Sequence, residues 1–317
     1  MCKDNATSVN EIFLQGFKNL YNYNIVFFLF ILLIFIVILV GNLLIIVSVS
    51  VSQQLRHPMY FFLKNLSTAD VLLASNILPA LLHVILWEGG HLSLTGCILQ
   101  YYVHSCLLIA QSYILTVMSY DRYLAICYPL HYATIINTKN CLYLVSFSWI
   151  FSCILMSSEL IIIVQMEFCG SSVIDHYFCD IAEILQISTS YNMILMWDDF
   201  VVSLLCVFFP FLLIVSSYIC IFFTILKISS MSGQKKAFST CSSHLLMVCV
   251  YYGTLNSIYI VPSGDNSQND NKFKSLIYIV LPPLINPIVY SLRNREMIES
   301  IKTLTYKHVR AEKCWRV

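Results

Sequence analysis

The residues of this sequence that could do chemistry are strongly polar side chains placed inside long apolar segments. Asn42, Asp70 and Asn286 each lie within such a segment. A charged group at the centre of a membrane helix costs about 2.5 to 3.5 kcal/mol on insertion scales, so each one requires an explanation. Two explanations remain open: the three side chains meet in a polar centre that holds water or sodium, or they join helices by hydrogen bonds.

Asp121-Arg122-Tyr123 is a second polar group, at the end of another apolar run. Its arginine can pair with the adjacent aspartate and still reach water, although such a pair is often only an anchor at the membrane surface. The apolar segments contain His, Ser and Cys, but no histidines spaced as zinc ligands and no glycine-framed serine nucleophile. We therefore expect neither an intramembrane enzyme nor a bound metal or other cofactor.

The composition of the 317 residues is that of a membrane protein. Hydrophobic residues make up 58% of the chain and charged residues 11%, whereas about 25% of the residues in a soluble domain are charged. This excludes a water-soluble globular protein. The formal net charge is only +1, so the overall balance gives no indication of nucleic-acid binding.

Seven apolar runs are long enough to cross a bilayer as helices. The hydrocarbon core is about 30 Å thick, and a helix needs roughly 20 apolar residues to span it. The runs cover Ile25 to Val49, Met59 to Leu86, Cys97 to Ile126, Cys141 to Val164, Ile194 to Leu226, Phe238 to Val261 and Leu276 to Leu292. No internal repeat or soluble insert interrupts them, so we expect a single all-α membrane domain, residues 1–317, built as a seven-transmembrane-helix bundle in a lipid bilayer.

The basic residues indicate how the bundle is oriented, because cytoplasmic loops carry the excess of Lys and Arg. With the amino terminus outside, only Lys3, Lys18, Lys272 and Lys274 of the 18 basic residues face outward. We therefore expect residues 1–24 to be extracellular, with N-glycosylation at Asn5, followed by the bundle at 25–292 and a cytoplasmic tail at 293–317. The start of this tail alternates basic and apolar side chains, which predicts a short amphipathic eighth helix on the inner leaflet.

One face of the third run predicts a ligand site in the outer half of the bundle. Helical spacing of three and four residues puts Tyr101, His104, Ser105, Leu108, Ile109 and Ser112 on one side. We expect neighbouring helices to contribute Val202, Ser203, Cys206, Tyr252, Leu255, Asn256, Tyr259, Leu276 and Ile279. Pockets between bundle helices are mostly apolar, with a few polar groups that orient the ligand. The alternative is that these faces are ordinary helix-packing surface.

The side chains of the third-helix face also bear on the chemistry of the ligand. The face carries no carboxylate in its middle, and His104 is its one ionisable group, either hydrogen-bonded within the fold or in contact with a ligand. Asp198 and Asp199, at the outer start of the fifth run, are interpreted as a solvated helix end. We therefore expect a small, largely apolar and neutral ligand.

Three of the 13 cysteines, apart from Cys2, lie on the oxidising side of the membrane and are placed to form a disulfide. Cys97 stands at the outer start of the third run, and Cys169 and Cys179 lie in the long outer loop. A bridge from Cys97 would hold this loop over the bundle. The spacing alone does not choose between the two partners.

Short motifs follow one another in a set order along nearly the whole chain. The first half contains Gly41-Asn42, Pro58-Met59-Tyr60-Phe61-Phe62-Leu63, Asn65-Leu66-Ser67 with Asp70, and Met118-Ser119-Tyr120-Asp121-Arg122-Tyr123-Leu124-Ala125-Ile126-Cys127. The second half contains Ser217-Tyr218, Lys236-Ala237-Phe238-Ser239-Thr240-Cys241-Ser242-Ser243-His244-Leu245 and Pro287-Ile288-Val289-Tyr290-Ser291-Leu292-Arg293-Asn294. Any one of them could be accidental, but the ordered set resembles the vertebrate odorant (olfactory) receptors, a family of rhodopsin-like G-protein-coupled receptors.

The resemblance implies a receptor of the plasma membrane that binds a small-molecule odorant and is not an enzyme. It also implies coupling to a heterotrimeric, stimulatory G protein of the olfactory type, which raises cyclic AMP. Asp121, Arg122 and Tyr123 would then form the switch at the G-protein face, with Tyr218 and Tyr290 as its partners. The helix faces described above would line the odorant pocket.

The resemblance selects Cys97 with Cys179 as the main disulfide. Members of the family usually have a further outer-loop cysteine ten residues after Cys179, where this chain has Thr189. Cys169 therefore lacks its expected partner, and we expect it to be free or to pair differently.

Two other classes of protein compete with this interpretation. A transporter or channel would tend to show inverted repeats and broken helices, whereas the seven unequal runs show no internal symmetry. A receptor of the same superfamily with a non-odorant ligand is harder to separate, because the motifs report on folding and coupling more than on ligand chemistry.

Overall fold

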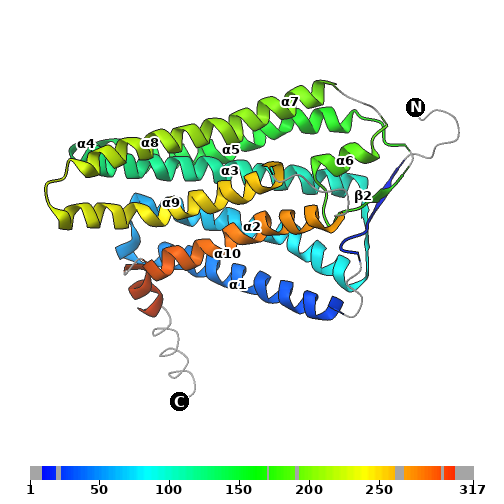
Figure 1. Ribbon diagram of the computed structural model, residues 1–317, viewed down its shortest axis with the longest axis horizontal. Helices are drawn as coiled ribbons and strands as arrows, with labels where there is room; N and C mark the ends of the chain where they lie inside the picture. The colour runs from blue at the N-terminus through cyan, green and yellow to red at the C-terminus, as the bar shows by residue number, and fades with distance from the viewer. Residues whose placement is uncertain are drawn as a thin grey trace, which may run out of the picture.

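Long helices packed side by side form the protein (Figure 1). This computed structural model describes residues 9–18, 23–169, 171–189, 193–260, 268–293 and 296–303. The long helices are α1 (Asn24–Val51), α2 (Pro58–Leu86), α3 (Leu94–Cys127), α5 (Thr138–Val164), α9 (Met231–Ile260) and α10 (Gln268–Arg293). One further rod consists of α7 (Met193–Ser203), the π-helical turn η3 (Leu204–Phe208) and α8 (Phe209–Leu226). The shorter helices are η2 (Gln53–Leu55), α4 (Pro129–Ile135) and α6 (Ile181–Ile187), and residues 296–303 are also helical.

Six of the described segments are long and apolar enough to cross a membrane: α1, α2, α3, α5, the rod 193–226 and residues 269–290 of α10. They correspond to six of the seven predicted runs. The remaining run, 238–261, falls almost entirely within α9, whose first half is rich in Lys, Ser and Thr. α9 packs against α10 and α3 within the same bundle.

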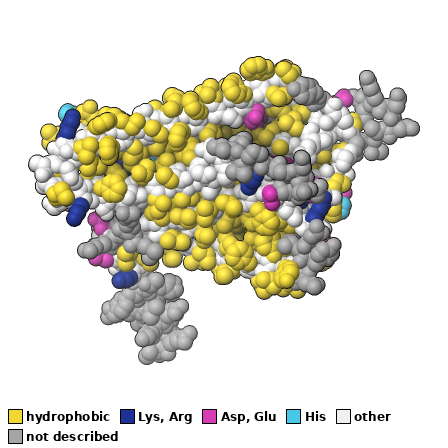
Figure 2. Space-filling model, in the orientation of Figure 1, with side chains coloured by type: hydrophobic (Ala, Val, Ile, Leu, Met, Phe, Trp, Pro, Cys, Tyr) yellow, Lys and Arg dark blue, Asp and Glu magenta, His cyan; other side chains and the backbone are white. Residues whose placement is uncertain are grey.

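α3 lies at the centre of the bundle, and the surrounding helices turn apolar surface outward. Of the apolar stretch of α3, 72% is buried, against 22% of that of α1. Leu29, Ile150 and Phe222 are examples of the large apolar side chains that α1, α5 and α8 leave exposed. Hydrophobic side chains cover much of the visible face between the two ends of the bundle (Figure 2). A surface of this kind suits lipid rather than water.

Buried hydrogen bonds join α1, α2, α3 and α10 in the middle of the bundle. Asp70 accepts one bond from Asn286 Nδ2 at 2.6 Å and another from Gln111 Nε2 at 2.8 Å. Asn42 Nδ2 donates to the carbonyl oxygen of Pro283 at 2.9 Å. Asn42, Asp70 and Asn286 are all buried. The structure thus shows the three polar residues joining helices by hydrogen bonds, and it adds Gln111, which the sequence had not suggested.

A three-stranded sheet covers one end of the bundle, here named the sheet end. β1 (Glu11–Leu14) is the central strand, antiparallel to β2 (Gly90–Ser93) and parallel to β3 (Val173–Ile174). The disulfide between Cys97 and Cys179 lies at this same end and is as predicted. The helix α4 lies at the opposite end of the bundle (Figure 1).

Asp175 binds two lysines and so fastens three segments of the sheet end together. Its carboxylate lies 2.6 Å from Lys272 Nζ of α10 and 2.9 Å from Lys18 Nζ of the amino-terminal segment. Lys272 is fully buried and also donates to the carbonyl oxygen of Gly16 at 2.7 Å. Burial alone would raise the pKa of Asp175, but the hydrogen bonds and charges of the two lysines outweigh it and hold this pKa below its ordinary value.

The structure differs from the sequence-based expectations at α10 and Cys169, and its described residues do not include Asn5. α10 begins at Gln268, two turns before the predicted start at Leu276, because its polar first turns lie against the sheet end, where Asp175 neutralises Lys272. Cys169 is disulfide-bonded, so the expectation of a free thiol is wrong and that of a different pairing remains. Asn5 and most of the predicted tail lie outside the described residues.

We predict that Asp175→Asn lowers the thermal midpoint of the detergent-purified protein at neutral pH. The native pKa is depressed, so the stabilisation is fully present above the unfolded pKa of about 3.9 and is lost as the pH falls through the lower native value. Melting curves of both proteins from pH 7 to pH 3 should therefore converge at the acid end. A gap between the two midpoints that stayed constant over this range would contradict the role given to the ionised carboxylate.

Candidate functional site

A cavity of about 140 Å³ lies between the helices below the sheet end. α3, α5, the start of α6, the rod α7–η3, α9 and α10 all contribute to its wall. The lining residues are Tyr101, His104, Ser105, Leu108, Ile109, Met156, Glu159, Asp180, Ile181, Asp199, Val202, Ser203, Cys206, Val207, Tyr251, Leu255 and Tyr278. A cavity of this order of size holds a molecule such as benzene.

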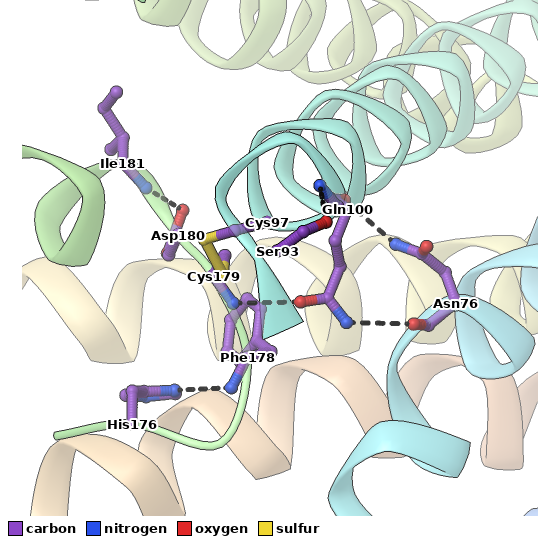
Figure 3. Close-up of a disulfide and its surroundings, with 10 residues drawn as sticks. Asn76, Ser93, Cys97, Gln100, His176, Phe178, Cys179, Asp180 and Ile181 are labelled. Atoms are coloured by element: carbon purple, nitrogen blue, oxygen red, sulfur yellow. Dashed lines mark hydrogen bonds between the residues drawn. A yellow bond between two sulfur atoms is a disulfide. The ribbon is translucent and has the colours of Figure 1, made fainter. Parts of the chain in front are cut away.

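The loop after α5 closes the cavity on the side of the sheet, and several bonds fix its course (Figure 3). The Cys97–Cys179 disulfide ties it to α3. The backbone N–H of Cys179 donates to Gln100 Oε1 at 3.1 Å, and Gln100 Nε2 donates in turn to the carbonyl oxygen of Asn76 on α2 at 3.2 Å. Asp180 caps α6 by accepting from the N–H of Ile181 at 2.8 Å. The residues facing the cavity from this loop are therefore held in place.

Two polar contacts organise the wall of the cavity. His104 Nε2 is 2.9 Å from the hydroxyl of Tyr278, which joins α3 to α10. Nδ1 of the same ring is buried and has no hydrogen-bond partner among the described residues. On the same face of α3, the hydroxyl of Tyr101 donates to the carboxylate of Glu159 on α5. The cavity thus combines apolar surface with a small set of oriented polar groups.

Pro210 explains why the rod meets α3 below the cavity. Proline has no N–H, so the carbonyl of Cys206, four residues earlier, cannot accept the bond that an α-helix would give it. Ser112 Oγ donates to this carbonyl at 2.8 Å, and the hydroxyl of Tyr252 lies 3.0 Å from the same Oγ. Tyr113 donates to the next carbonyl back, that of Leu205, at 3.0 Å. The irregular turn η3 therefore supplies acceptors that fasten α3 and α9.

A second polar cluster lies at the opposite end of the bundle, next to α4. Arg122 Nη2 is 3.0 Å from Asp121 Oδ2, and Tyr132 of α4 donates to Asp121 Oδ1 at 2.7 Å. Tyr123 packs its ring edge-on against Tyr128, with 5.6 Å between centroids. Asp121 and Arg122 of the sequence motif therefore form an ion pair, and α4 holds its acidic member.

Tyr218 and Tyr290 lie near this cluster without bonding to Arg122. Tyr218 Oη is 2.7 Å from His244 Nδ1, and His244 Nε2 is 3.1 Å from the carbonyl oxygen of Leu115. One neutral tautomer satisfies both contacts: Nε2–H donates to Leu115, and Nδ1 accepts from Tyr218. The ring of His244 thus links α3, α8 and α9. The buried hydroxyl of Tyr290 has no hydrogen-bond partner among the described residues.

Comparison with known proteins settles the family. The family profile described as Olfactory receptor matches residues 31–308. The chain belongs to the olfactory receptor family. Olfactory receptor 1M1 of Mus musculus is 37% identical over 305 residues, which is 96% of this chain and 97% of that protein. Olfactory receptor 1500 of Rattus norvegicus is 40% identical over 297 residues (94% and 95%), and Olfactory receptor 11A1 of Homo sapiens is 37% identical over 297 residues (94% of each).

Family membership confirms the broad sequence-based predictions. The protein is an odorant receptor, it is a multi-pass membrane protein, and it is not an enzyme. Nine of the residues predicted for the odorant pocket do line the cavity of this olfactory receptor. They are Tyr101, His104, Ser105, Leu108, Ile109, Val202, Ser203, Cys206 and Leu255.

Five predicted pocket residues of the receptor lie elsewhere, four of them because the rotation of two helices was not foreseen and one because of its depth. On α9 the inward stripe is Tyr251 and Leu255, so Tyr252 and Asn256, one residue further on, are turned by about 100° towards α8. On α10 Tyr278 faces the cavity, and Leu276 and Ile279 are buried in the core. Ser112 lies about one helical turn beyond the α3 residues that line the cavity. The side chain of Tyr259 lies outside the described residues.

Other lining residues of the receptor were missed by the sequence-based reasoning. They are Met156, Glu159, Asp180, Ile181, Asp199, Val207, Tyr251 and Tyr278. Asp199 thus lines the cavity instead of forming only a solvated helix end. Glu159 had a visible signal, since it is a lone carboxylate within an apolar run, like Asp70. Asp180 and Ile181 had none, because the path of their loop depends on the disulfide and the sheet.

Replacing Gln100 by Leu should destabilise the loop that closes the cavity. The substitution leaves the N–H of Cys179 without its acceptor, and an unsatisfied buried donor costs about 1–3 kcal/mol. The thermal midpoint of the detergent-purified receptor should fall accordingly. Leu99→Ala, at the adjacent but exposed position, is the matched control, and an equal fall in both variants would refute the assignment.

Proposed function

We propose that this odorant receptor binds its odorant in the cavity below the sheet end, on the extracellular side of the plasma membrane. The Cys97–Cys179 disulfide supports this orientation, since disulfides form in oxidising compartments. The distribution of Lys and Arg supports it independently. The cavity is the observation that carries the proposal, because convergent polar groups in an apolar hollow are typical of small-molecule sites.

A seventh crossing and a short eighth helix complete the proposed arrangement. α9 is 30 residues long and packs inside the bundle, so it is long enough to span the bilayer despite its polar first half. Residues 296–303 form the eighth helix on the inner leaflet, where Met297 is fully buried and Tyr60 donates to Glu296 at 2.7 Å. The amino terminus is extracellular, and Asn5 is its glycosylation site.

Signal transfer follows as a shift between two arrangements of the helices. An odorant can move this balance only by binding one arrangement more tightly than the other. Asp121, Arg122 and Tyr123 form the switch for a stimulatory, olfactory-type G protein that raises cyclic AMP, and Tyr218 and Tyr290 become partners of Arg122 when the inner end of α9 moves outward. The polar core of Asn42, Asp70 and Asn286 holds the neighbouring helices meanwhile.

Arg122→Ala should abolish odorant-dependent cyclic AMP while leaving the cavity unchanged. The substitution removes the cation of the switch, which lies far from the cavity lining. The assay uses cells that express the olfactory-type G protein, a panel of volatile molecules, and surface labelling to show equal display. Robust signalling from a correctly displayed Arg122→Ala receptor would overturn the mechanism.

His244→Phe should raise basal cyclic AMP in the same cells. Its ring holds α9 against α3 and α8, and two hydrogen bonds of about 0.5–1.5 kcal/mol each correspond to a shift of roughly 5- to 150-fold in the balance between the two arrangements. Ser242→Ala, whose hydroxyl bonds the carbonyl of Ser239 in its own helix, is the control. Unchanged or reduced basal activity in His244→Phe would show that these bonds do not stabilise the silent arrangement.

A further inference from the structure

We propose that the cavity selects small organic cations, namely compact apolar molecules that carry one protonated amine. This inference rests on the proposed odorant site and names the class of its ligand. The ligand remains largely apolar, as expected from the sequence, but the expectation of a neutral molecule is replaced. That expectation was based on the third-helix face alone, whereas the charged groups come from other elements.

Three carboxylates line the cavity from three different elements. Glu159 lies on α5 and Asp199 on α7, and Asp180 is the residue that caps the start of α6. Glu159 is only 1% exposed. The carboxylates, together with Asp198, are near enough to interact electrostatically, so the negative charges of those that are ionised add up in the cavity.

No lysine or arginine is among the described residues that line the cavity. Lys18 and Lys272, at the same end of the bundle, both pair with Asp175 instead. Burying carboxylates without a counter-charge is unfavourable, and a buried charge is normally paired. A cationic ligand would supply the missing charge, and its own desolvation would be offset by the same contacts.

A metal ion fits this arrangement less well than an organic cation does. Among the described residues, no group of three or more His, Cys, Asp and Glu side chains is arranged to hold a metal ion. The carboxylates are instead distributed around a space lined by Leu108, Ile109, Met156 and other apolar side chains. Such a wall provides contacts for the hydrocarbon part of a ligand and several acceptors for its ammonium group.

His104 provides an independent sign that the site is built to receive a polar group of a ligand. The residue lines the cavity and is 1% exposed. Its Nδ1 has no hydrogen-bond partner among the described residues, and in the tautomer in which Nε2–H donates to Tyr278 this nitrogen presents a lone pair. A protonated amine has N–H groups to donate there, in addition to those directed at a carboxylate. The cavity volume of about 140 Å³ limits the hydrocarbon part to roughly a six-membered ring.

The test compares three molecules of the same shape and different charge: cyclohexylamine, cyclohexanol and cyclohexanecarboxylic acid, with propylamine and benzylamine as further amines. Dose–response curves for cyclic AMP are recorded for the wild type and for Glu159→Gln, Asp199→Asn and Glu167→Gln at equal surface display. Glu167 is an exposed carboxylate just after α5 that does not line the cavity, so Glu167→Gln is the matched control.

We expect the amines to be the most potent wild-type ligands. Glu159→Gln should raise their half-maximal concentration by about 30-fold or more, the loss typical of a buried charge pair, and Asp199→Asn should act in the same direction. Cyclohexanol should be affected little, and Glu167→Gln should change no curve by more than about twofold. Cyclohexanol or the acid matching the amines in the wild type, or equal losses for amine and alcohol in Glu159→Gln, would overturn the proposal.

A thermal-shift measurement on the detergent-purified receptor separates this inference from the proposed function. The amines should raise the melting midpoint of the wild type more than that of Glu159→Gln. Such a shift without cyclic AMP would uphold the ligand class and count against the proposed coupling. Activation by neutral molecules alone, with no shift from any amine, would uphold the receptor function and overturn the ligand class.

Discussion

Inside a lipid bilayer no water is available to satisfy a polar group, and this constraint governs the interior of the bundle. Asp70 shows its effect most directly. Its two oxygens take bonds from α3 and α10 at once, so the rotation of three helices is tied to one side chain. Ser112 and the carbonyl of Cys206 play the same part between α3 and the rod. Apolar packing brings the helices together, whereas these few polar contacts select one rotation among many.

The sequence predicted well what depends on local pattern. Apolar length located the helices, and helical spacing found the face of α3 from Tyr101 to Ile109, because both are properties of one segment. The orientation of α9 was missed by one residue, and Tyr251 rather than Tyr252 faces the cavity. No periodicity could have settled this, since both tyrosines are buried and the choice depends on contacts with α3 and α8.

Two other differences have separate physical causes. Glu159, like Asp70, is a carboxylate within an apolar run. The same rule should therefore have included the fourth predicted helix in the site. The predicted start of α10 was too late for another reason. A search for apolar runs stops at the first charged residues, whereas the helix continues through Lys272, whose charge Asp175 compensates. Hydropathy measures the membrane-embedded part of a helix, and the helix itself extends as far as its polar partners allow.

The order of the sheet strands along the chain determines when, during synthesis, the sheet can form. β1 precedes every helix of the described residues, yet its partners follow α2 and α5 in the chain. The strand cannot be paired on both sides until the first 174 residues have been made, and all three strands must by then have reached the same side of the membrane. If one helix were inserted in the wrong orientation before that point, β1 would lack a hydrogen-bonded partner strand on one side. Pairing of the central strand on both sides therefore requires that the helices between the strands have been inserted in the right orientation.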